Sequence, residues 1–417
     1  MATSDDRLVE SLQSVEEALR RLRAGEFLIV IDDGSPHNTG DLALAAEFAT
    51  PERLNFIMSH ARSSVSVACT AERLEQLGIN LLPRDPDSHG PAWATPVDAR
   101  YGVTTGDSAE DRATTIRVLL DPRTQPHDLV RPGHLQLLQA APGGVMQRAA
   151  HTEAIVDLCR LAGLYPMGVT SQLLDPSGRS AELDYVREFA QTHSIHIVTI
   201  ADIIRYRRRT EKLVEKVADA RLPTIFGDFH VMVYRSLVDD TEFLAVVKGD
   251  PSGCDAPLVR VHSGCVTGDV LGSLKCDCGW QLHAALSKIA AADCGVLVYI
   301  PSHEGRGIGL ANKIRAYHLQ ERGLDTVQAN VALGLPPDAR DYGLGAQVLV
   351  DLGVRRMRLM SNNPKKFAAL QGYGLEVVER VPLEAPTTEY NWQYLLTKRD
   401  KLGHMLATGK DSGQDDG

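Results

Sequence analysis

The sequence predicts an α/β fold with mixed α+β sheets, built as two domains. The first observation is length, because 417 residues exceed one ordinary hydrophobic core and suit two domains of about 200 residues each. The second is pattern, since β-branched apolar runs alternate with stretches of helical periodicity in both halves. The third is a charged segment near the middle that ends at a proline, which is typical of a domain boundary.

The N-terminal half opens with a predicted amphipathic helix over residues 7–23, where apolar side chains recur at helical spacing and Gly25 ends the pattern. The strand-like run FLIVIDD follows. Up to about residue 205, apolar runs such as SVSVAC and HIVTI alternate with helical stretches such as DRATTIRVLL and HTEAIVDLCRLAGL. This alternation predicts a complete α/β domain.

The charged segment RYRRRTEKLVEKVADARLPT covers residues 205–224. The strand-like runs HVMVYRSL and FLAVVKG then open a second α/β pattern. The predicted organisation is therefore a first domain over residues 1–205, a linker over 206–213, a second domain over 214–406 and a disordered tail over 407–417.

Composition excludes several function classes. Hydrophobic residues at 43% and charged residues at 24% are near the averages of globular proteins, which argues against a disordered or membrane protein. The formal net charge of -10 argues against a general nucleic-acid binder, which needs a basic face. No run of about 18 apolar residues occurs, and the N-terminal segment has no apolar signal core. We expect a cytoplasmic protein that binds neither nucleic acid nor a membrane.

Three of the seven cysteines, Cys265, Cys276 and Cys278, crowd into the segment HSGCVTGDVLGSLKCDCGWQL. Soft thiolates suit zinc, and three protein ligands leave the fourth tetrahedral position open to water, as in a hydrolase. The alternative is a closed structural site completed by His262, His303 or another cysteine. The missing second ligand pair favours the open site. The other cysteines are predicted to be small buried hydrophobic residues: Cys69, Cys159, Cys254 and Cys294.

Three later segments are rich in groups that bind phosphates and purines. YIPSHEGRGIGLANKIRAYHLQ places glycines before a predicted helix, where backbone amides approach an anion closely. LPPDARDYGLGAQVL and MSNNPKKFAAL add charged and amide side chains, although ordinary turn and capping chemistry explains each segment alone. Together with an open zinc site they favour nucleotide chemistry. The candidates are Glu304, Arg306, Lys313, Arg315, Tyr317, Asp338, Arg340, Asp341, Ser361, Asn362, Asn363, Lys365 and Lys366.

Residues 214–406 resemble GTP cyclohydrolase II throughout. The matching segments are ARLPTIFGDF, the cysteine cluster with its TGD and DCG, HEGRGIGLANKIRAY, LGLPPDARDYGLGAQVL, SNNPKKFAALQGYGLEVVERVPL and TKRDKLGHML. The resemblance implies hydrolysis of GTP to formate, pyrophosphate and 2,5-diamino-6-(5-phosphoribosylamino)pyrimidin-4(3H)-one, the first step of riboflavin-type pathways. It also implies a homodimer, Zn²⁺ held by Cys265, Cys276 and Cys278, and Mg²⁺ bound with the triphosphate.

The resemblance assigns roles to single residues. Arg340 would be the nucleophile that takes the guanylyl group, Asp338 the proton acceptor beside it, and Tyr317 would orient water or an intermediate. The implied GTP contacts are Arg260, Gln281, Glu304, Arg306, Thr326, Ser361 and Lys366, with Glu304 and Gln281 on the guanine edge. Two positions depart from the family pattern: Gly264 stands where Glu is usual, and Pro301 where Arg is usual. Either change is expected to weaken GTP binding or alter the charge of the site.

Residues 7–205 resemble 3,4-dihydroxy-2-butanone 4-phosphate synthase in FLIVIDD, GDLALAAEFAT, YGVTTGDSAEDRATTI, LVRPGH, GGVMQRAAHTEAIVDLCRLAGLYPMGV and VTIADIIRYR. The acidic loop that holds magnesium in that family reads DDGSPHNTGD here, with Pro36, His37 and Thr39 replacing Arg, Glu and Glu. Gln172 replaces a glutamate and Ser66 a cysteine. The surviving pocket residues are Asp41, Arg148, His151 and Thr152.

These losses predict a GTP cyclohydrolase whose N-terminal domain is a catalytically silent scaffold. Other accounts of that domain are a ligand sensor, or new metal chemistry at His37 and His151. The alternatives for the whole protein are a bifunctional enzyme that also makes 3,4-dihydroxy-2-butanone 4-phosphate from ribulose 5-phosphate, a cyclohydrolase that releases a formamidopyrimidine, and a non-enzymatic zinc and nucleotide-binding protein.

Overall fold

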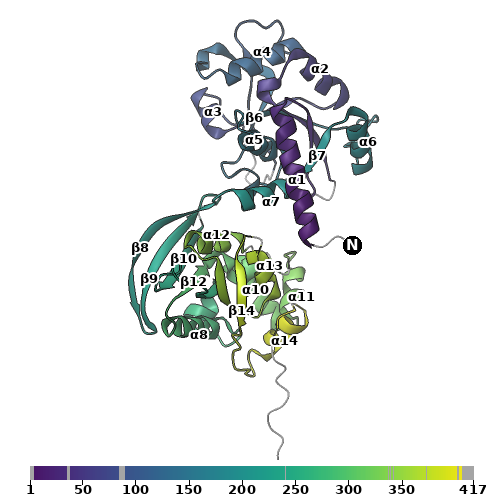
Figure 1. Cartoon of the computed structure of the whole chain (residues 1–417). Helices are drawn as coiled ribbons and strands as arrows, with labels where there is room; N and C mark the ends of the chain where they lie inside the picture. The colour runs from purple at the N-terminus through teal and green to yellow at the C-terminus, as the bar shows by residue number, and fades with distance from the viewer. Residues whose placement is uncertain are drawn as a thin grey trace, which may run out of the picture. The chain divides into compact units, whose positions relative to one another are not determined.

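The computed structural model describes residues 4–34, 38–83, 90–239, 241–336, 338, 340, 342–371, 373–401 and 403–405. Its contacts divide the chain into two compact units, Met1–Thr210 and Glu211–Gly417. Over the described residues, each unit is built on a seven-stranded sheet flanked by helices (Figure 1). The predicted mixed α/β fold is therefore confirmed.

The sheet of the N-terminal unit has the order β4-β5-β3-β6-β2-β1-β7. Parallel pairs (β1 with β7, β3 with β5) and antiparallel pairs both occur in it. Its strands are β1 Leu28–Ile31, β2 Gly40–Ala45, β3 Ser66–Cys69, β4 Ala92–Ala99, β5 Leu129–Gln139, β6 Met167–Gln172 and β7 His196–Thr199. Its helices are α1 Ser4–Arg23, α2 Pro51–His60, α3 Ala71–Gln76, α4 Ala109–Leu120, α5 His151–Leu161, α6 Leu183–His193 and α7 Ile200–Thr210.

Both faces of this sheet are covered, which explains why its strands read as continuous apolar runs. Successive side chains of a strand point to opposite faces. Leu28 and Val30 of β1 accordingly join the apolar core formed with α1, α5 and α7, whereas Ile29 and Ile31 join the core formed with α2, α4 and α6. The predicted N-terminal helix is present, and the chain leaves it at Gly25, whose φ of 75° favours glycine.

The sheet of the C-terminal unit has the order β14-β13-β11-β12-β10-β9-β8. Strands β14, β13, β11 and β12 run parallel, and β10, β9 and β8 continue the sheet antiparallel. The strands are β8 Val214–Thr224, β9 Gly227–Ser236, β10 Glu242–Lys248, β11 Leu258–Ser263, β12 Gly295–Ile300, β13 Arg356–Met360 and β14 Glu376–Val381. The helices are α8 Cys278–Ala290, α9 Glu304–Gly307, α10 Gly309–Gln320, α11 Thr326–Ala332, α12 Gly343–Asp351, α13 Pro364–Gln371 and α14 Trp392–Asp400.

The parallel part of this sheet positions the candidate site. In such sheets ligands bind beyond the carboxyl ends of the strands. Cys265 follows β11, the HEGRG segment follows β12, and Ser361 follows β13. The three strands are neighbours, so segments about 40 and 60 residues apart in the sequence meet at one edge of the sheet.

Two details differ from the expectations. Residues 206–210, assigned above to a linker, are the last part of α7, and β8 begins at Val214. Cys254 and Cys294, predicted to be unpaired, form a disulfide. They precede β11 and β12, which pair in the sheet, and this adjacency brings them together. Cys69 and Cys159 are buried as predicted. Pro36, His37, Asp341, the side chain of Lys365 and the tail 407–417 lie outside the described residues.

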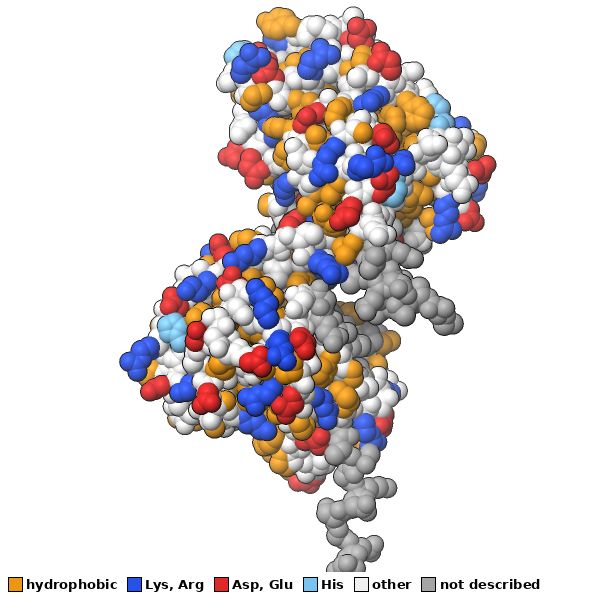
Figure 2. Space-filling model, viewed as in Figure 1, with side chains coloured by type: hydrophobic (Ala, Val, Ile, Leu, Met, Phe, Trp, Pro, Cys, Tyr) orange, Lys and Arg blue, Asp and Glu red, His pale blue; other side chains and the backbone are white. Residues whose placement is uncertain are grey.

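The surface agrees with the composition. Within the part of the chain that the structure describes, no helix is both long and apolar enough to cross a membrane. The face seen in Figure 2 intersperses lysine and arginine with aspartate and glutamate over both units. That face therefore lacks the continuous basic surface that nucleic-acid binding requires.

Candidate metal and nucleotide site

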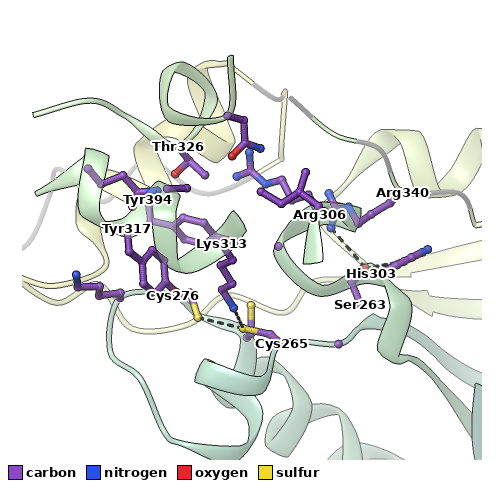
Figure 3. A pocket seen from close by; sticks show the side chains of 18 residues that line it. Ser263, Cys265, Cys276, His303, Arg306, Lys313, Tyr317, Thr326, Arg340 and Tyr394 are labelled. Atoms are coloured by element: carbon purple, nitrogen blue, oxygen red, sulfur yellow. Dashed lines mark hydrogen bonds between the residues drawn. The ribbon is translucent and has the colours of Figure 1, made fainter. Parts of the chain in front are cut away.

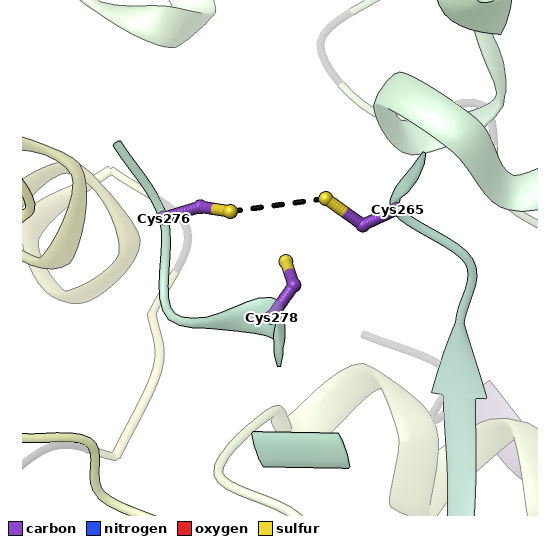
Figure 4. Close-up of side chains that lie close together, drawn as sticks. All are labelled: Cys265, Cys276 and Cys278. Carbon is purple, nitrogen blue, oxygen red and sulfur yellow. Dashed lines mark hydrogen bonds between the residues drawn. The ribbon is translucent and has the colours of Figure 1, made fainter. Parts of the chain in front are cut away.

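The three predicted zinc ligands converge (Figure 4). Cys265 follows β11, Cys276 lies in the loop before α8, and Cys278 begins that helix. Their sulfur atoms lie within 4.8 Å of one another, and the Sγ atoms of Cys265 and Cys276 are 3.7 Å apart. Tetrahedral zinc with bonds of about 2.3 Å to sulfur separates its ligands by about 3.8 Å. The thiol cluster therefore fits zinc.

Both histidines considered as a fourth ligand make other contacts. His262 Nε2 donates to the Asp269 carboxylate at 3.2 Å, and His303 Nδ1 hydrogen-bonds with Ser263 Oγ at 3.2 Å. Asp269 also accepts the backbone N–H of Cys265 at 2.9 Å, which fixes the first ligand of the cluster. No fourth His, Cys, Asp or Glu joins the cluster among the described residues, an arrangement that favours an open site over a closed one.

Lys313 and Glu304 lie directly beside the thiols. Lys313 Nζ donates to Cys265 Sγ at 3.0 Å and to Glu304 Oε1 at 2.6 Å, while Glu304 Oε2 accepts the N–H of Val266 at 2.6 Å. Hydrogen bonds from Cys276 and Cys278, together with Lys313, hold the pKa of the Cys265 thiol far below its usual range. In this structure both oxygens of Glu304, expected on the guanine edge, are engaged beside the cluster.

A cavity lies over the cysteines, and Figure 3 shows the side chains that line it. Tyr317 and Thr326, both predicted site residues, line it. The Tyr317 hydroxyl lies 3.2 Å from Thr267 Oγ1, two residues after the first cysteine. Burial raises the pKa of Tyr317, so this hydroxyl stays protonated and is able to donate.

Arg306 is a buried cation of this site. Only 7% of it is exposed, and neither terminal guanidinium nitrogen has a hydrogen-bond partner among the described residues. Its φ of 67° lies in the left-handed region, between Gly305 at 61° and Gly307 at 87°, so this strained turn places the side chain in the cavity. A buried cation is costly unless it is paired, so the position of Arg306 favours the binding of an anion there.

A second cavity, which shares lining residues with the first, is lined by five cations. Arg260 donates to Met360 O and to Gln281 Oε1, and Lys366 donates to Val261 O, so both have neutral partners. Burial and the nearby arginines hold the pKa of Lys366 well below its usual range. We call this cavity the basic chamber; its cations are Arg260, Arg306, Arg340, Lys366 and Lys398. Ser361, another predicted contact, also lines it.

Asp338 and Arg340 form a bidentate pair. Arg340 Nε and Nη2 donate to the two carboxylate oxygens at 2.8 and 2.6 Å, and Nη1 reaches Ser263 Oγ at 3.4 Å. Burial alone would raise the pKa of Asp338, but the bonds and charge of Arg340 lower it below its usual value. Arg340 lines both cavities, so the pair lies where they join.

The two departures from the family pattern are neighbours. Gly264 N donates to Ile300 O at 2.9 Å, and a Cβ added at Gly264 would lie 3.0 Å from both that oxygen and Pro301 Cα. A side chain at position 264 therefore requires the chain at 301 to move. The two substitutions form one local change at the carboxyl ends of β11 and β12.

The surviving pocket residues of the N-terminal unit are partly assembled. Asp41 Oδ1 lies 3.8 Å from His151 Nε2, while its Oδ2 accepts from Thr170 Oγ1 at 2.7 Å. Thr152 follows His151 at the start of α5 and is buried. Arg148 is instead paired with Glu153 at 2.8 Å. Gln172 lies opposite Asp41 on β6, where the family's glutamate would face it, and donates to Ser180 Oγ.

Comparison with known proteins decides the family. A family model for GTP cyclohydrolase II matches residues 215–382, and one for 3,4-dihydroxy-2-butanone 4-phosphate synthase matches residues 16–206. The riboflavin biosynthesis protein RibBA of Aquifex aeolicus is 52% identical over 94% of this chain and 98% of its own length. RibBA of Mycobacterium tuberculosis strain H37Rv is 51% identical over 95% of each chain. The chain belongs to the RibBA family.

A solved structure supports the same assignment. RibBX, a two-domain 3,4-dihydroxy-2-butanone 4-phosphate synthase from A. baumannii, has a TM-score of 0.66 and 36% identity, covering 89% of this chain and 99% of its own. Membership of the RibBA family confirms both resemblances. It also favours the bifunctional alternative over the purely structural N-terminal domain that the loop substitutions predicted.

Among the residues of this RibBA-family site that sequence reasoning missed, three come from the C-terminal part of the described chain. Tyr394, Lys398 and His404 come from α14 and the chain after it, and all line the basic chamber. The matching segment TKRDKLGHML contains the last two. Their sequence looks like an exposed charged helix, and only its packing against the loops after β11 and β13 brings them to the site.

Proposed function

We propose that the C-terminal unit hydrolyses GTP to formate, pyrophosphate and the diaminopyrimidine phosphoribosyl product. One observation carries this proposal: the cavity over a thiol cluster suited to zinc adjoins a chamber of buried cations and shares wall residues with it. Ser263, Cys278, Arg306, Arg340 and Tyr394 line both cavities, the first of which is drawn in Figure 3. A purine over the thiols with its triphosphate in the chamber satisfies both sets of groups.

The proposed roles follow from position. Arg260, Arg306, Ser361 and Lys366 bind the phosphates, and Thr326 and Gln281 contribute to the nucleoside contacts. Arg340 attacks the α-phosphorus, the bond to pyrophosphate breaks, and Asp338, already bonded to two nitrogens of Arg340, receives the proton. Water then hydrolyses the bond between Arg340 and the phosphorus, which releases the product as a phosphate monoester and restores Arg340. Glu304 fixes Lys313 and the chain at Val266 beside the cysteines, in addition to any contact with guanine.

Two metal ions belong to this proposal. Zinc held by Cys265, Cys276 and Cys278 would supply Lewis acidity and a water of lowered pKa for opening the imidazole ring. Tyr317, held by Thr267 at the wall of the same cavity, would orient water during release of formate. Magnesium would accompany the triphosphate, as hard cations do with phosphate oxygens. We further propose a cytoplasmic homodimer.

The N-terminal unit carries a second candidate function, formation of 3,4-dihydroxy-2-butanone 4-phosphate from ribulose 5-phosphate. The RibBA family and the approach of Asp41 to His151 favour it. The amide of Gln172 opposes it, because an amide cannot act as a general base in place of a carboxylate. The two accounts differ in one measurable activity.

Purified protein with zinc and magnesium tests both functions. Formate and pyrophosphate released from GTP in equal amounts would support the proposal, while pyrophosphate without formate would indicate a formamidopyrimidine product. Absence of GTP turnover would refute it and leave a zinc and nucleotide-binding protein. Ribulose 5-phosphate is assayed in parallel: its conversion establishes a bifunctional enzyme, and its persistence beside active GTP hydrolysis establishes a silent N-terminal unit.

A further inference from the structure

The C-terminal residues of the described chain form a wall of the basic chamber. Tyr394 and Lys398 from α14 and His404 after it line the chamber, and Tyr394 also lines the cavity over the cysteines. Tyr394 therefore lies where the two cavities meet, and its ring is 4.6 Å from Lys398 Nζ and 5.8 Å from the Arg306 guanidinium. None of these residues belongs to the predicted GTP contacts.

This wall is attached to the loops that carry the site. Lys398 Nζ donates to Asp277 Oδ1 at 2.5 Å, and Asp277 lies between Cys276 and Cys278. Met405 N donates to Asn362 O at 2.8 Å, next to Ser361. Lys401 pairs with Asp325, the N-cap residue of α11 that precedes Thr326. The C-terminal segment from α14 onward therefore contacts three parts of the site: the zinc loop, which we define as residues 276–278, the residues that follow β13, and the start of α11.

The chamber has more positive charge than the protein neutralises. Of its five cations, Arg340 and Lys398 pair with carboxylates, whereas Arg260 and Lys366 have carbonyl or amide partners and the Arg306 guanidinium tips have none among the described residues. Lys398 is buried, yet an ammonium has three donors and Asp277 uses one. The charge and the spare donors suit a bound polyanion.

We infer that α14 and the residues after it complete the nucleotide site, and that Lys398 is a phosphate-binding residue that remains paired with Asp277. Its ammonium would donate to Asp277 and to a phosphate oxygen together, which links the phosphates to the zinc loop. This inference rests on the proposed function for the identity of the anion. The chemistry required is a chain of phosphates, which inorganic triphosphate represents.

Binding of inorganic triphosphate to the zinc-loaded full-length protein, measured by calorimetry, tests the inference. We expect Lys398→Met to weaken this binding and raise KM for GTP, each on the order of 10-fold, with zinc content unchanged. Lys398→Arg should restore most of the affinity. Arg399→Gln is the matched control, because Arg399 lies on the same helix and its partner is the exposed Asp400. Unchanged triphosphate affinity in Lys398→Met would overturn the inference, as would a loss that accompanies loss of zinc.

Lys398→Met leaves the buried Asp277 without its lysine partner, and this variant could therefore fail to fold. His404→Glu is a second test that keeps this pair intact. Burial and the charge of Lys398 lower the pKa of His404 to about 3, so the native side chain is neutral. A carboxylate there should weaken triphosphate binding several-fold without lowering the melting temperature; unchanged binding would contradict the inference. If the wild type binds inorganic triphosphate but releases no formate from GTP, the proposed function fails while the assignment of Lys398 stands.

Discussion

The two units differ in the hydrogen-bond partners of their buried cationic side chains. In the N-terminal unit the guanidinium groups of the buried arginines are hydrogen-bonded: Arg207 pairs with Asp157 at 2.6 Å, and Arg73 donates to Leu119 O, Asp121 O and Gln76 Oε1. In the C-terminal unit Arg306 is equally buried, but its two terminal guanidinium nitrogens have no hydrogen-bond partner among the described residues. Paired charges hold helices together, whereas unpaired ones of a single sign mark the place of a ligand.

The largest effect on activity is expected from Arg306→Met. Two guanidinium nitrogens are available to phosphate, so their loss should reduce kcat/KM for GTP by roughly 100-fold. Stability without ligand should not fall, because an unpaired buried charge disappears. Steady-state kinetics and urea unfolding measure the two quantities. Arg315→Met is the control, since Arg315 is exposed on α10, donates to Asn312 and is not among the residues that line the two cavities.

A large loss of stability in Arg306→Met with unchanged kinetics would make Arg306 a structural residue. The contrast between the units would then fail at its clearest position.

Arg207→Met should behave in the opposite way. The change leaves Asp157, which is 1% exposed, without its closest charged partner, and breaking such a pair costs about 3 kcal/mol. GTP turnover should stay unchanged. Urea unfolding followed by circular dichroism would detect the loss. Arg205→Met removes an exposed pair with Asp202 and should cost less than about 1 kcal/mol; equal losses for both variants would refute the distinction.

The pH dependence of triphosphate binding should show that Lys366 takes up a proton when the anion binds. Its pKa is held well below the usual range by burial and by Arg260, and a bound triphosphate would raise it again. Binding therefore takes up a proton, and triphosphate affinity should fall as pH rises through the pKa of the free site. Calorimetry in buffers of different ionisation enthalpy would show the uptake. Lys366→Arg, which stays charged, should bind with a flatter pH profile, and an equally steep profile would exclude Lys366 as the source.

Site residues could be predicted from the sequence where they lie close together in one motif. Cys265, Cys276 and Cys278 lie in one short segment, and the strand order brings the segments with Arg306 and Ser361 to the same edge of the sheet. Sequence patterns could not show that Glu304 would be engaged by Lys313, because that contact depends on the turn at Gly305. The Cys254–Cys294 disulfide and the wall formed by Lys398 depend on tertiary adjacency across 40 and 121 residues.

The smallest effect is expected at Gly264 and Pro301, whose joint departure from the family pattern preserves the net charge of the site. Gly264→Glu alone should raise KM for GTP a few-fold, because its Cβ would meet Ile300 O and Pro301 Cα at 3.0 Å. Pro301→Arg alone adds a cation at an exposed position. If the two positions act as one unit, the double variant should recover part of the loss, since the new carboxylate and guanidinium would be neighbours able to pair. A double-mutant cycle on KM measures this coupling, and additive effects would show that the substitutions are independent.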